Sequence, residues 1–219
     1  MCFSPTASFL AAATTATIGL ATLRQVNHPR EVPLAGMPLL FASQQAVEGF
    51  LWLQLSGQND KAEVAALSLI FSIFAKVLWP AYTPLAVLLI EADQRRKRAL
   101  FAITLIGCMI SIYVLTWLSA KPSAAAICGH SIDYGGNENP FSWQSFPYLL
   151  CTCVPLLLSS QKTIQVFGAT VFVGFWVSAY TFSAAFISVW CFFAAAGSGV
   201  LYFYFRSAAP PVSRLNPSP

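Results

Sequence analysis

Residues 85–115, LAVLLIEADQRRKRALFAITLIGCMISIYVL, hold four consecutive basic residues between two long apolar runs. This pattern is typical of a cytoplasmic loop that joins two transmembrane helices, because Lys and Arg beside apolar spans stay on the cytoplasmic side. The composition agrees, since 57% of the residues are hydrophobic and only 9% are charged. In soluble domains about a quarter of the residues are charged. The sequence therefore predicts an all-α, multi-spanning membrane protein.

Seven segments are long enough, or nearly so, to cross a hydrocarbon core that requires about 20 apolar residues per helix. The predicted helices cover residues 7–23, 34–55, 64–90, 99–119, 145–160, 163–180 and 184–204. The last two are almost continuous, but one helix through both would be about 60 Å long, about twice the core thickness. We therefore predict a turn near Tyr180, Thr181 and Ser183, and a seven-helix transmembrane bundle.

The distribution of basic residues orients this bundle. Lys61 and Lys121 fall in loops on one side, and Lys76 falls inside the third span. The other nine of the twelve Lys and Arg residues fall on the opposite side: Arg24, Arg30, Arg95, Arg96, Lys97, Arg98, Lys162, Arg206 and Arg214. We therefore expect the N-terminus outside and the C-terminus in the cytoplasm. No nucleic-acid partner is expected, because it would bind a clustered basic face of a soluble domain.

The remaining segments are short. Residues 1–206 are predicted to form the transmembrane domain, and residues 207–219, rich in Pro and Ser, a disordered cytoplasmic tail. No cleavable signal peptide is expected, because residues 1–4 carry no basic side chain. Any functional site should then lie in the bundle or in the outer loop around residues 120–143.

The span 34–55 is unusually polar, because Gln44, Gln45 and Glu48 lie in its middle. Spacings of three and four residues place both glutamines on the same side as Glu48. A carboxylate at this depth, about 10 Å from the helix end, is costly unless it faces the bundle interior, and it marks a functional site by default. Lys76 is a candidate partner. The alternatives are a structural ion pair with Lys76 and a ligand-binding or proton-relay role for Glu48.

The third span contains the sequence KVLWPAYTP, residues 76–84. Each proline removes a backbone donor and frees a carbonyl one turn earlier, so a kink or a locally unwound helix is expected. Irregular backbone at membrane depth is tolerated only where protein or a cavity satisfies it. Trp79 and Tyr82 therefore join the candidate site, together with Trp52. The alternative is a kink that only shapes packing.

The six cysteines divide by topology. Four fall within predicted spans, where a thiol usually acts as a small apolar group: Cys108, Cys151, Cys153 and Cys191. Cys2 and Cys128 fall on the outer side, where oxidising conditions permit a disulfide. A bond between them is a hypothesis, since the sequence does not show that they approach each other.

Enzyme and cofactor signatures are missing from the sequence. It contains no GxSxG, no HExxH and no glycine-rich phosphate loop. Cys128, His130 and Asp133 have acceptable ligand types for zinc, but their spacing is not a standard ligand pattern. We expect no metal and no cofactor, with these three residues as weak metal candidates.

Four separated motifs resemble an uncharacterised family of small bacterial multi-pass membrane proteins. They are Met-Cys-Phe-Ser-x-x-Ala-Ser-Phe at the N-terminus, Pro-Leu-Leu-Phe-x-x-Gln-Gln-x-x-Glu-Gly-x-x-Trp over residues 38–52, Trp79-Pro80, and Ser188-Val-Trp-Cys-Phe-Phe-Ala-Ala. The resemblance implies a bacterial plasma-membrane location and brings no established activity. Lys76 is outside the matching positions, which include Cys2, Gln44, Gln45, Glu48, Trp52, Trp79, Pro80 and Trp190.

Two classes of function agree with these features. The first is a small sensor or transporter that binds a ligand or ion at the polar cluster of the second and third spans. The second is a membrane-embedded enzyme acting on lipid, with Glu48 or the loop of Cys128, His130 and Asp133 in a catalytic role. The shortage of histidine favours the first class. Expected partners are membrane lipids and a small-molecule or ion ligand.

Overall fold

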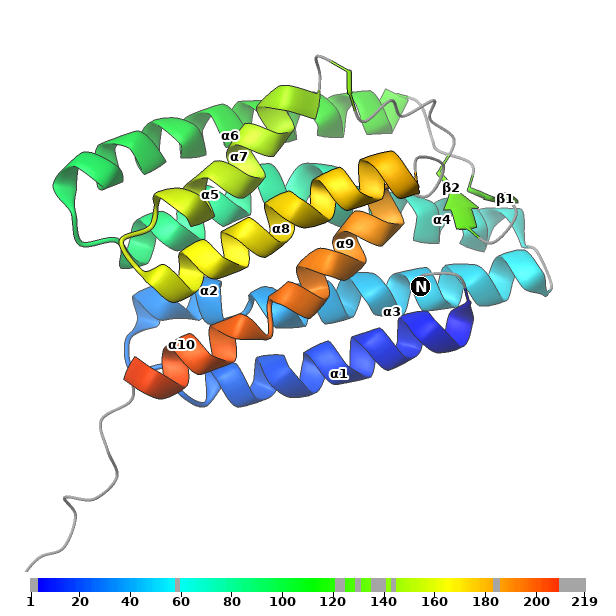
Figure 1. Ribbon diagram of the computed structural model, residues 1–219. Helices are drawn as coiled ribbons and strands as arrows, with labels where there is room; N and C mark the ends of the chain where they lie inside the picture. The colour runs from blue at the N-terminus through cyan, green and yellow to red at the C-terminus, as the bar shows by residue number, and fades with distance from the viewer. Residues whose placement is uncertain are drawn as a thin grey trace, which may run out of the picture.

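The computed structural model describes residues 4–57, 60–120, 125–128, 131–134, 141–142, 145–182 and 186–208. Within these ranges the chain is mostly helical, and its long helices run side by side in one bundle (Figure 1). The expected all-α fold with seven helical segments is confirmed. The orientation of the bundle relative to a membrane remains a prediction.

Ten α-helices form the seven described segments, because three of the segments are interrupted. Helix α2 (Val32–Ala35) leads into α3, a π-helical turn (Ile73–Leu78) joins α4 to α5, and α9 and α10 follow each other in one segment. The remaining helices have these bounds: α1 Pro5–Leu23, α3 Met37–Ser56, α4 Lys61–Ser72, α5 Trp79–Ile90, α6 Gln94–Ala120, α7 Ser145–Leu158, α8 Lys162–Thr181, α9 Phe186–Gly197 and α10 Val200–Ala208.

Local capping residues decide where several helices begin. Asp60 accepts a hydrogen bond from the backbone N–H of Ala62 at the start of α4. The Asp93 carboxylate does the same for the N–H groups of Arg95 and Arg96, so α6 begins five residues before the predicted residue 99. An N-terminal cap of this type satisfies donors that have no partner inside the helix. The four basic residues thus lie in the first turns of α6 instead of in a loop.

The C-terminal end also differs from the expected bounds. Helix α10 continues to Ala208, two residues into the segment expected to be disordered. The rest of the expected tail, residues 209–219, lies outside the described residues. Helix α8 continues through Tyr180 to Thr181, and α9 begins at Phe186. Ser183, the third residue of the expected turn, lies outside the described residues.

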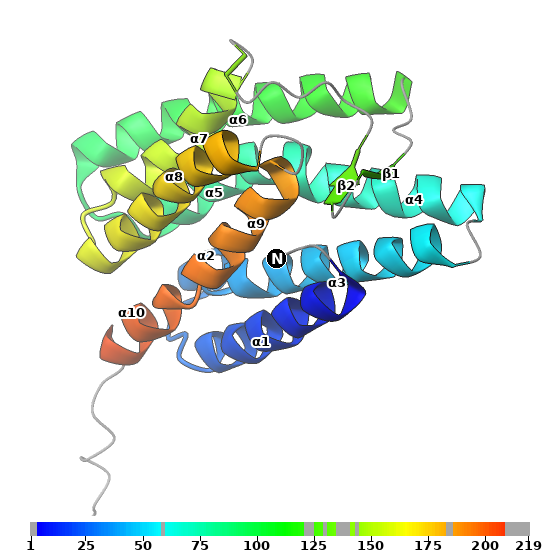
Figure 2. The ribbon, with the colours of Figure 1, turned by 45° about the vertical axis from the view of Figure 1, so that its right-hand side comes forward.

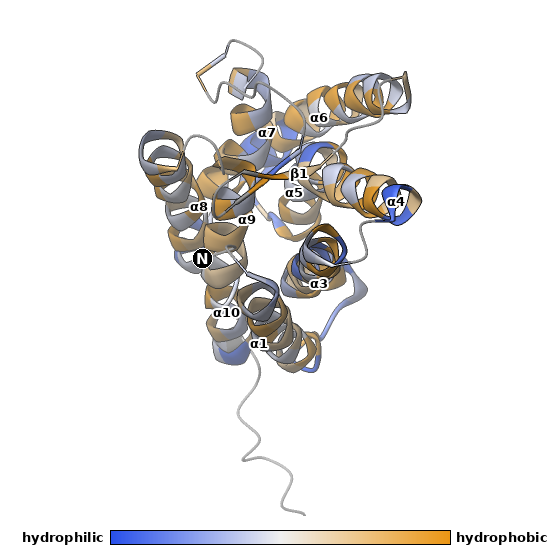
Figure 3. Ribbon diagram, turned by 90° about the vertical axis from the view of Figure 1, so that its right-hand side faces the viewer, coloured by the Kyte–Doolittle hydropathy of each residue, from blue (hydrophilic) through white to orange (hydrophobic). Residues whose placement is uncertain are grey.

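Five described segments are long and apolar enough to cross a membrane: Pro5–Leu23, Lys61–Ile90, Gln94–Ala120, Lys162–Thr181 and Phe186–Ser207. Helix α7 is apolar but shorter. Apolar residues dominate much of α6 in the view along the bundle (Figure 3). Phe101, Leu105, Met109 and Ile112 of α6 are each more than half exposed. These features are compatible with an integral membrane protein, in which such side chains contact lipid.

Helix α3 packs along α1 and meets α4, the π turn and α9. Helix α9 crosses from α8 toward α1 and α3, which places it beside the middle of α3 (Figures 1 and 2). Helix α5 packs against α6 and α7. At Gly107 of α6 a Cβ would lie 1.9 Å from the carbonyl oxygen of Pro80, so this approach of α6 to α5 requires glycine.

A short hairpin covers one end of the bundle beside α4 (Figures 1 and 2). Strands β1 (Ala126–Cys128) and β2 (Ser131–Asp133) pair antiparallel, with Ile127 opposite Ile132. Ile132 is 2% exposed and belongs to an apolar cluster that includes Leu51 and Trp52. The region expected to be a polar outer loop therefore sends apolar side chains into the bundle.

Candidate functional site

Glu48 lies at the centre of a buried polar cluster. Its side chain is 0% exposed. The hydroxyl of Ser188, on α9, donates a hydrogen bond to Glu48 Oε1. The hydroxyl of Tyr134, directly after β2, donates to the same oxygen across 3.4 Å. Three segments that are far apart in the sequence thus meet at one carboxylate.

The face of α3 that carries Glu48 is buried along most of its length. Met37, Phe41, Gln44, Glu48 and Trp52 follow one another at spacings of three and four residues, and each is at most 5% exposed. Residues at these spacings share one helix face. The face changes from apolar at Met37 to polar at Gln44 and Glu48. Gln45, beside this face, is also fully buried.

Trp79 connects α5 to this face of α3. Its indole N–H donates to Gln44 Oε1 at 3.1 Å, and its ring stacks on Phe41 with centroids 4.1 Å apart. Tyr82 meets the edge of Trp79, but its hydroxyl donates to the carbonyl of Pro33 at 2.8 Å. Of these two expected site residues, the structure therefore brings Trp79 to Gln44, whereas Tyr82 is anchored to Pro33 of α2.

Two buried donors flank Glu48 along α3, one turn on either side. Gln44 Nε2 and Trp52 Nε1 have no hydrogen-bond partner among the described residues. A buried polar group without a hydrogen-bond partner lowers the stability of the folded state by about 1–3 kcal/mol. Such donors require an acceptor, which a bound water or ligand supplies.

A cavity of about 40 Å³ lies beside Trp79. This volume exceeds the roughly 10–15 Å³ that one water requires. Five aromatic side chains form part of its walls: Phe41, Trp79, Tyr148, Phe167 and Trp190. The indole of Trp190 donates to the Val171 carbonyl at 2.9 Å, and the Tyr148 hydroxyl donates to the Ala75 carbonyl. The cavity is therefore largely apolar, and it adjoins the polar cluster through Trp79 and Gln44.

The helix that carries Lys76 is irregular, as the two prolines predict. Pro80 has no N–H for the Lys76 carbonyl, and residues 73–78 adopt a π-helical turn. Neighbouring helices satisfy exposed carbonyls of this turn: Tyr148 binds the Ala75 carbonyl, and Ser111 of α6 binds the Val77 carbonyl at 2.5 Å. Lys76 itself is half-buried. Its pairing with Glu48 remains a prediction.

A second buried carboxylate, Glu91, was not among the expected site residues. It is 3% exposed and follows α5. Its Oε1 accepts from the N–H groups of Ala92 and Asp93 at 2.9 and 3.0 Å, and its Oε2 accepts from the N–H of Ser160 at 2.8 Å. Burial opposes ionisation, but these backbone donors outweigh it and lower the pKa of Glu91 below its ordinary value.

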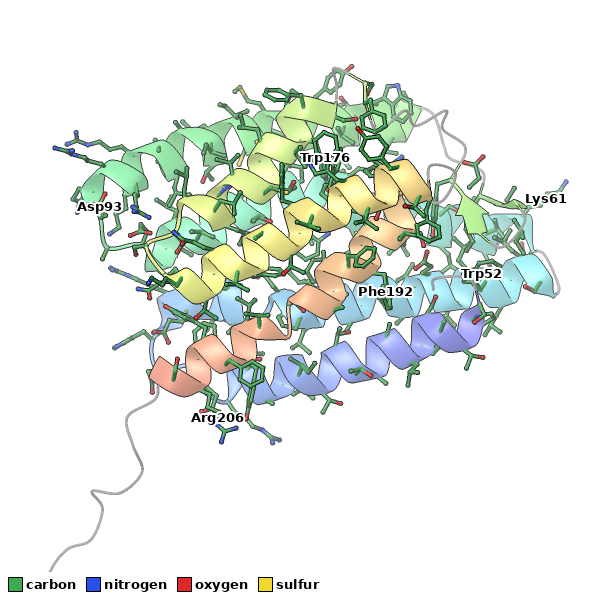
Figure 4. All side chains as sticks on the ribbon, in the orientation of Figure 1. Trp52, Lys61, Asp93, Trp176, Phe192 and Arg206 are labelled. Atoms are coloured by element: carbon green, nitrogen blue, oxygen red, sulfur yellow. The ribbon has the colours of Figure 1, made fainter. Side chains whose placement is uncertain are left out.

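Arg96 completes the link between two turns at this end of the bundle. Its Nη1 donates to the carbonyls of Leu158 and Ser159, both at 2.8 Å. The turn between α5 and α6 is thus joined to the turn between α7 and α8. Asp93 and Arg206 lie at this end, whereas Lys61 and Trp52 lie toward the hairpin (Figure 4).

Two expectations for the outer loop lie wholly or partly outside the described residues. Cys2 and His130 are not described, and Cys128 is described by its backbone only. Asp133 is half-buried in β2. Among described side chains, no three His, Cys, Asp or Glu residues gather to hold a metal ion. The disulfide between Cys2 and Cys128 and the weak metal candidates remain predictions.

Sequence reasoning missed Tyr134 and Ser188 as contacts of Glu48. Ser188 opens one of the motifs quoted above, but a serine in an apolar helix commonly bonds its own backbone. Tyr134 lies in a polar loop that gave no sign of entering the bundle. The hydrogen bonds join residues 86 and 140 positions apart, and no local pattern encodes such partners.

The chain matches the family of unknown function DUF6629 over residues 1–215. The protein belongs to this family. The expected resemblance to an uncharacterised family is thereby confirmed, whereas a bacterial origin remains a prediction. No curated protein and no solved structure matches the chain. Function therefore has to be argued from the site itself.

Proposed function

We propose that this protein is a small sensor or transporter of the bacterial plasma membrane that binds an ion or a small polar ligand around Glu48. The observation that carries the proposal is the burial of Glu48 inside the helix bundle, with hydroxyl donors from α9 and from the segment after β2. An ionisable side chain within transmembrane helices is expensive, and it is the usual mark of an ion or substrate pathway.

The surroundings of Glu48 support the binding of a ligand, in addition to a structural role of Glu48. Gln44 Nε2 and Trp52 Nε1 have no described partner, and both are buried one turn from Glu48. A guest with acceptor atoms removes the cost of these donors. The cavity of about 40 Å³ lies beside Trp79, which donates to Gln44, and its volume favours a small ligand.

We further propose that the hairpin end of the bundle is outside and the end with Glu91 is cytoplasmic. Arg95, Arg96, Lys97 and Arg98 open α6 at the Glu91 end, next to Asp93, and Lys61 lies toward the hairpin (Figure 4). The excess of basic residues at one end supports this orientation. Membrane lipids would then surround the exposed apolar faces of α6 and its neighbours.

A ligand-dependent stability assay tests the proposal. Anything that binds the folded state alone raises the melting temperature. Wild-type protein in detergent would be screened against pH, monovalent and divalent cations, and small polar molecules. We expect at least one condition to stabilise the wild type and to lose its effect in Glu48→Gln.

The matched control is Glu63→Gln, which removes the charge of an exposed glutamate on α4. We expect this variant to respond as the wild type does. Equal responses of wild type, Glu48→Gln and Glu63→Gln to every condition would contradict a binding role for Glu48.

A further inference from the structure

Tyr134 separates Glu48 from the hairpin. Its side chain is 5% exposed, and its ring stacks on Phe71 of α4 with centroids 4.3 Å apart and planes 5° apart. Two residues earlier, Ile132 is buried in the same apolar cluster as Phe71 and Leu51. The hydroxyl of Tyr134 points inward to Glu48 Oε1 at 3.4 Å. A tyrosine ring held in this way covers the carboxylate from the hairpin side.

The groups around Glu48 favour a proton over a metal cation. Two buried groups one turn from Glu48, Gln44 Nε2 and Trp52 Nε1, are N–H donors, and such donors repel a metal cation. Ca²⁺ takes 6–8 oxygen ligands. The hydroxyls of Ser188 and Tyr134 both donate to Glu48 Oε1. A proton, in contrast, requires no coordination shell.

The ionisable neighbours of Glu48 lie on several elements. Helix α1 and helix α2 contain none within their bounds. The elements that pack against α3 carry Lys61 and Glu63 on α4, Lys76 in the π turn and Cys191 on α9, and β2 and the residue after it carry Asp133 and Tyr134. The charges of these groups, together with burial, act on the protonation of Glu48.

We propose that Glu48 is a proton-binding site and that Tyr134 is the residue through which its proton is exchanged with the hairpin face. This inference rests on the proposed function of the Glu48 cluster and names the ion that Glu48 binds, while a water serves as the acceptor for Gln44 Nε2 and Trp52 Nε1. A tyrosine hydroxyl can donate and accept at the same time. The Tyr134 O–H bond that faces Glu48 breaks as a new O–H bond forms on Glu48 Oε1. The Tyr134 oxygen takes a replacement proton from hydronium on the hairpin side, which leaves water. Tyr134 stays neutral, and the carboxylate becomes a carboxylic acid.

Infrared difference spectroscopy on protein reconstituted in phosphatidylcholine vesicles tests both parts. Between low and high pH we expect the wild type to show a carboxylic-acid carbonyl band that is absent in Glu48→Gln. Tyr134→Phe keeps the ring on Phe71 and removes the hydroxyl. In this variant the band should persist, and its deuterium exchange should slow about a hundredfold, the lower end of what a positioned proton-transfer group contributes.

The matched control is Tyr82→Phe, which removes a half-buried hydroxyl bound to Pro33 and should exchange at the wild-type rate. Exchange in Tyr134→Phe at the wild-type rate would overturn the relay. A wild-type protein without a titrating band that depends on Glu48 would overturn proton binding. If that band is absent while an ion or small molecule still stabilises the wild type and not Glu48→Gln, the proposed function stands and only this inference fails.

A second measurement avoids any dependence on how the variants fold. Dicyclohexylcarbodiimide, an apolar reagent that attacks protonated carboxyls, is applied to the wild type over a range of pH, and modification of Glu48 is read by peptide mass spectrometry. We expect modification to fall as pH rises. A yield at Glu48 that does not change with pH would count against the proposal.

Discussion

Glu48 and Glu91 are both buried carboxylates, but their hydrogen-bond donors differ. Glu91 is bound by three backbone N–H groups from two turns at one end of the bundle. Such donors are fixed in place and cannot accept a proton, so they hold the charged form. Glu48 is bound by the hydroxyls of Ser188 and Tyr134, which can either donate or accept. Glu91 therefore acts as a fixed link between turns, whereas the hydroxyl donors at Glu48 suit the change of protonation state proposed above.

The largest effect on stability is expected at Glu91. Glu91→Ala leaves three partly buried backbone donors without their acceptor, and we expect a loss of about 3 kcal/mol, because hydrogen bonds to charged groups each contribute roughly 1.5–3 kcal/mol and solvent replaces part of them. Chemical unfolding in detergent measures this loss. Glu63→Ala, at an exposed glutamate in the first turn of α4 that accepts a hydrogen bond from Gln54, should lower stability by about 1 kcal/mol or less. Similar losses of unfolding free energy in both variants would show that Glu91 stabilises the fold no more than a surface carboxylate does.

The contribution of Glu91 should also depend on pH. Its pKa in the folded protein is lowered from the ordinary value of 4.5, so its stabilising effect is fully present above that value and is lost as pH falls through the folded pKa. The difference in melting temperature between wild type and Glu91→Gln should therefore be constant near neutral pH and shrink in acid. A difference that grows in acid would contradict this assignment.

A smaller loss is expected at Arg96, which supports the same link. Arg96→Ala removes the guanidinium that binds the carbonyls of Leu158 and Ser159, with an expected loss of about 2 kcal/mol. Arg95→Ala is the control, because Arg95 is exposed one position earlier in the same basic run. Equal unfolding free energies for the two variants would show that the link does not stabilise the bundle.

The smallest effect on stability is expected at Glu48. Glu48→Gln keeps an acceptor for Ser188 and Tyr134, so we expect stability to change by about 1 kcal/mol or less. If Glu48 instead forms a structural ion pair with Lys76, the same change would cost about 3–5 kcal/mol. Unfolding of Glu48→Gln, measured beside Glu91→Gln, separates the two cases.

The sequence by itself determined the seven helical segments, of which five are long and apolar enough to cross a membrane and α3 is not one of the five, and the inward position of Gln44, Gln45 and Glu48. Apolar length and helical period are local properties of the chain, so they can be read without knowing the neighbours. The irregular helix before Pro80 was equally predictable, because proline lacks its backbone donor wherever it occurs. That the irregularity takes the form of a π turn was not predictable.

Only the tertiary structure decided what each buried group contacts. Glu48 meets a hydroxyl 140 positions away, and Glu91 meets the N–H of Ser160 69 positions away. The hydrogen-bond partner of each carboxylate depends on which helices become neighbours and on where along the bundle axis their turns lie. Gly107, for example, brings α6 against the carbonyl of Pro80. A carboxylate in the sequence therefore indicates that its burial costs free energy. The packing of distant segments decides whether backbone N–H groups, as at Glu91, or side-chain hydroxyls, as at Glu48, offset that cost.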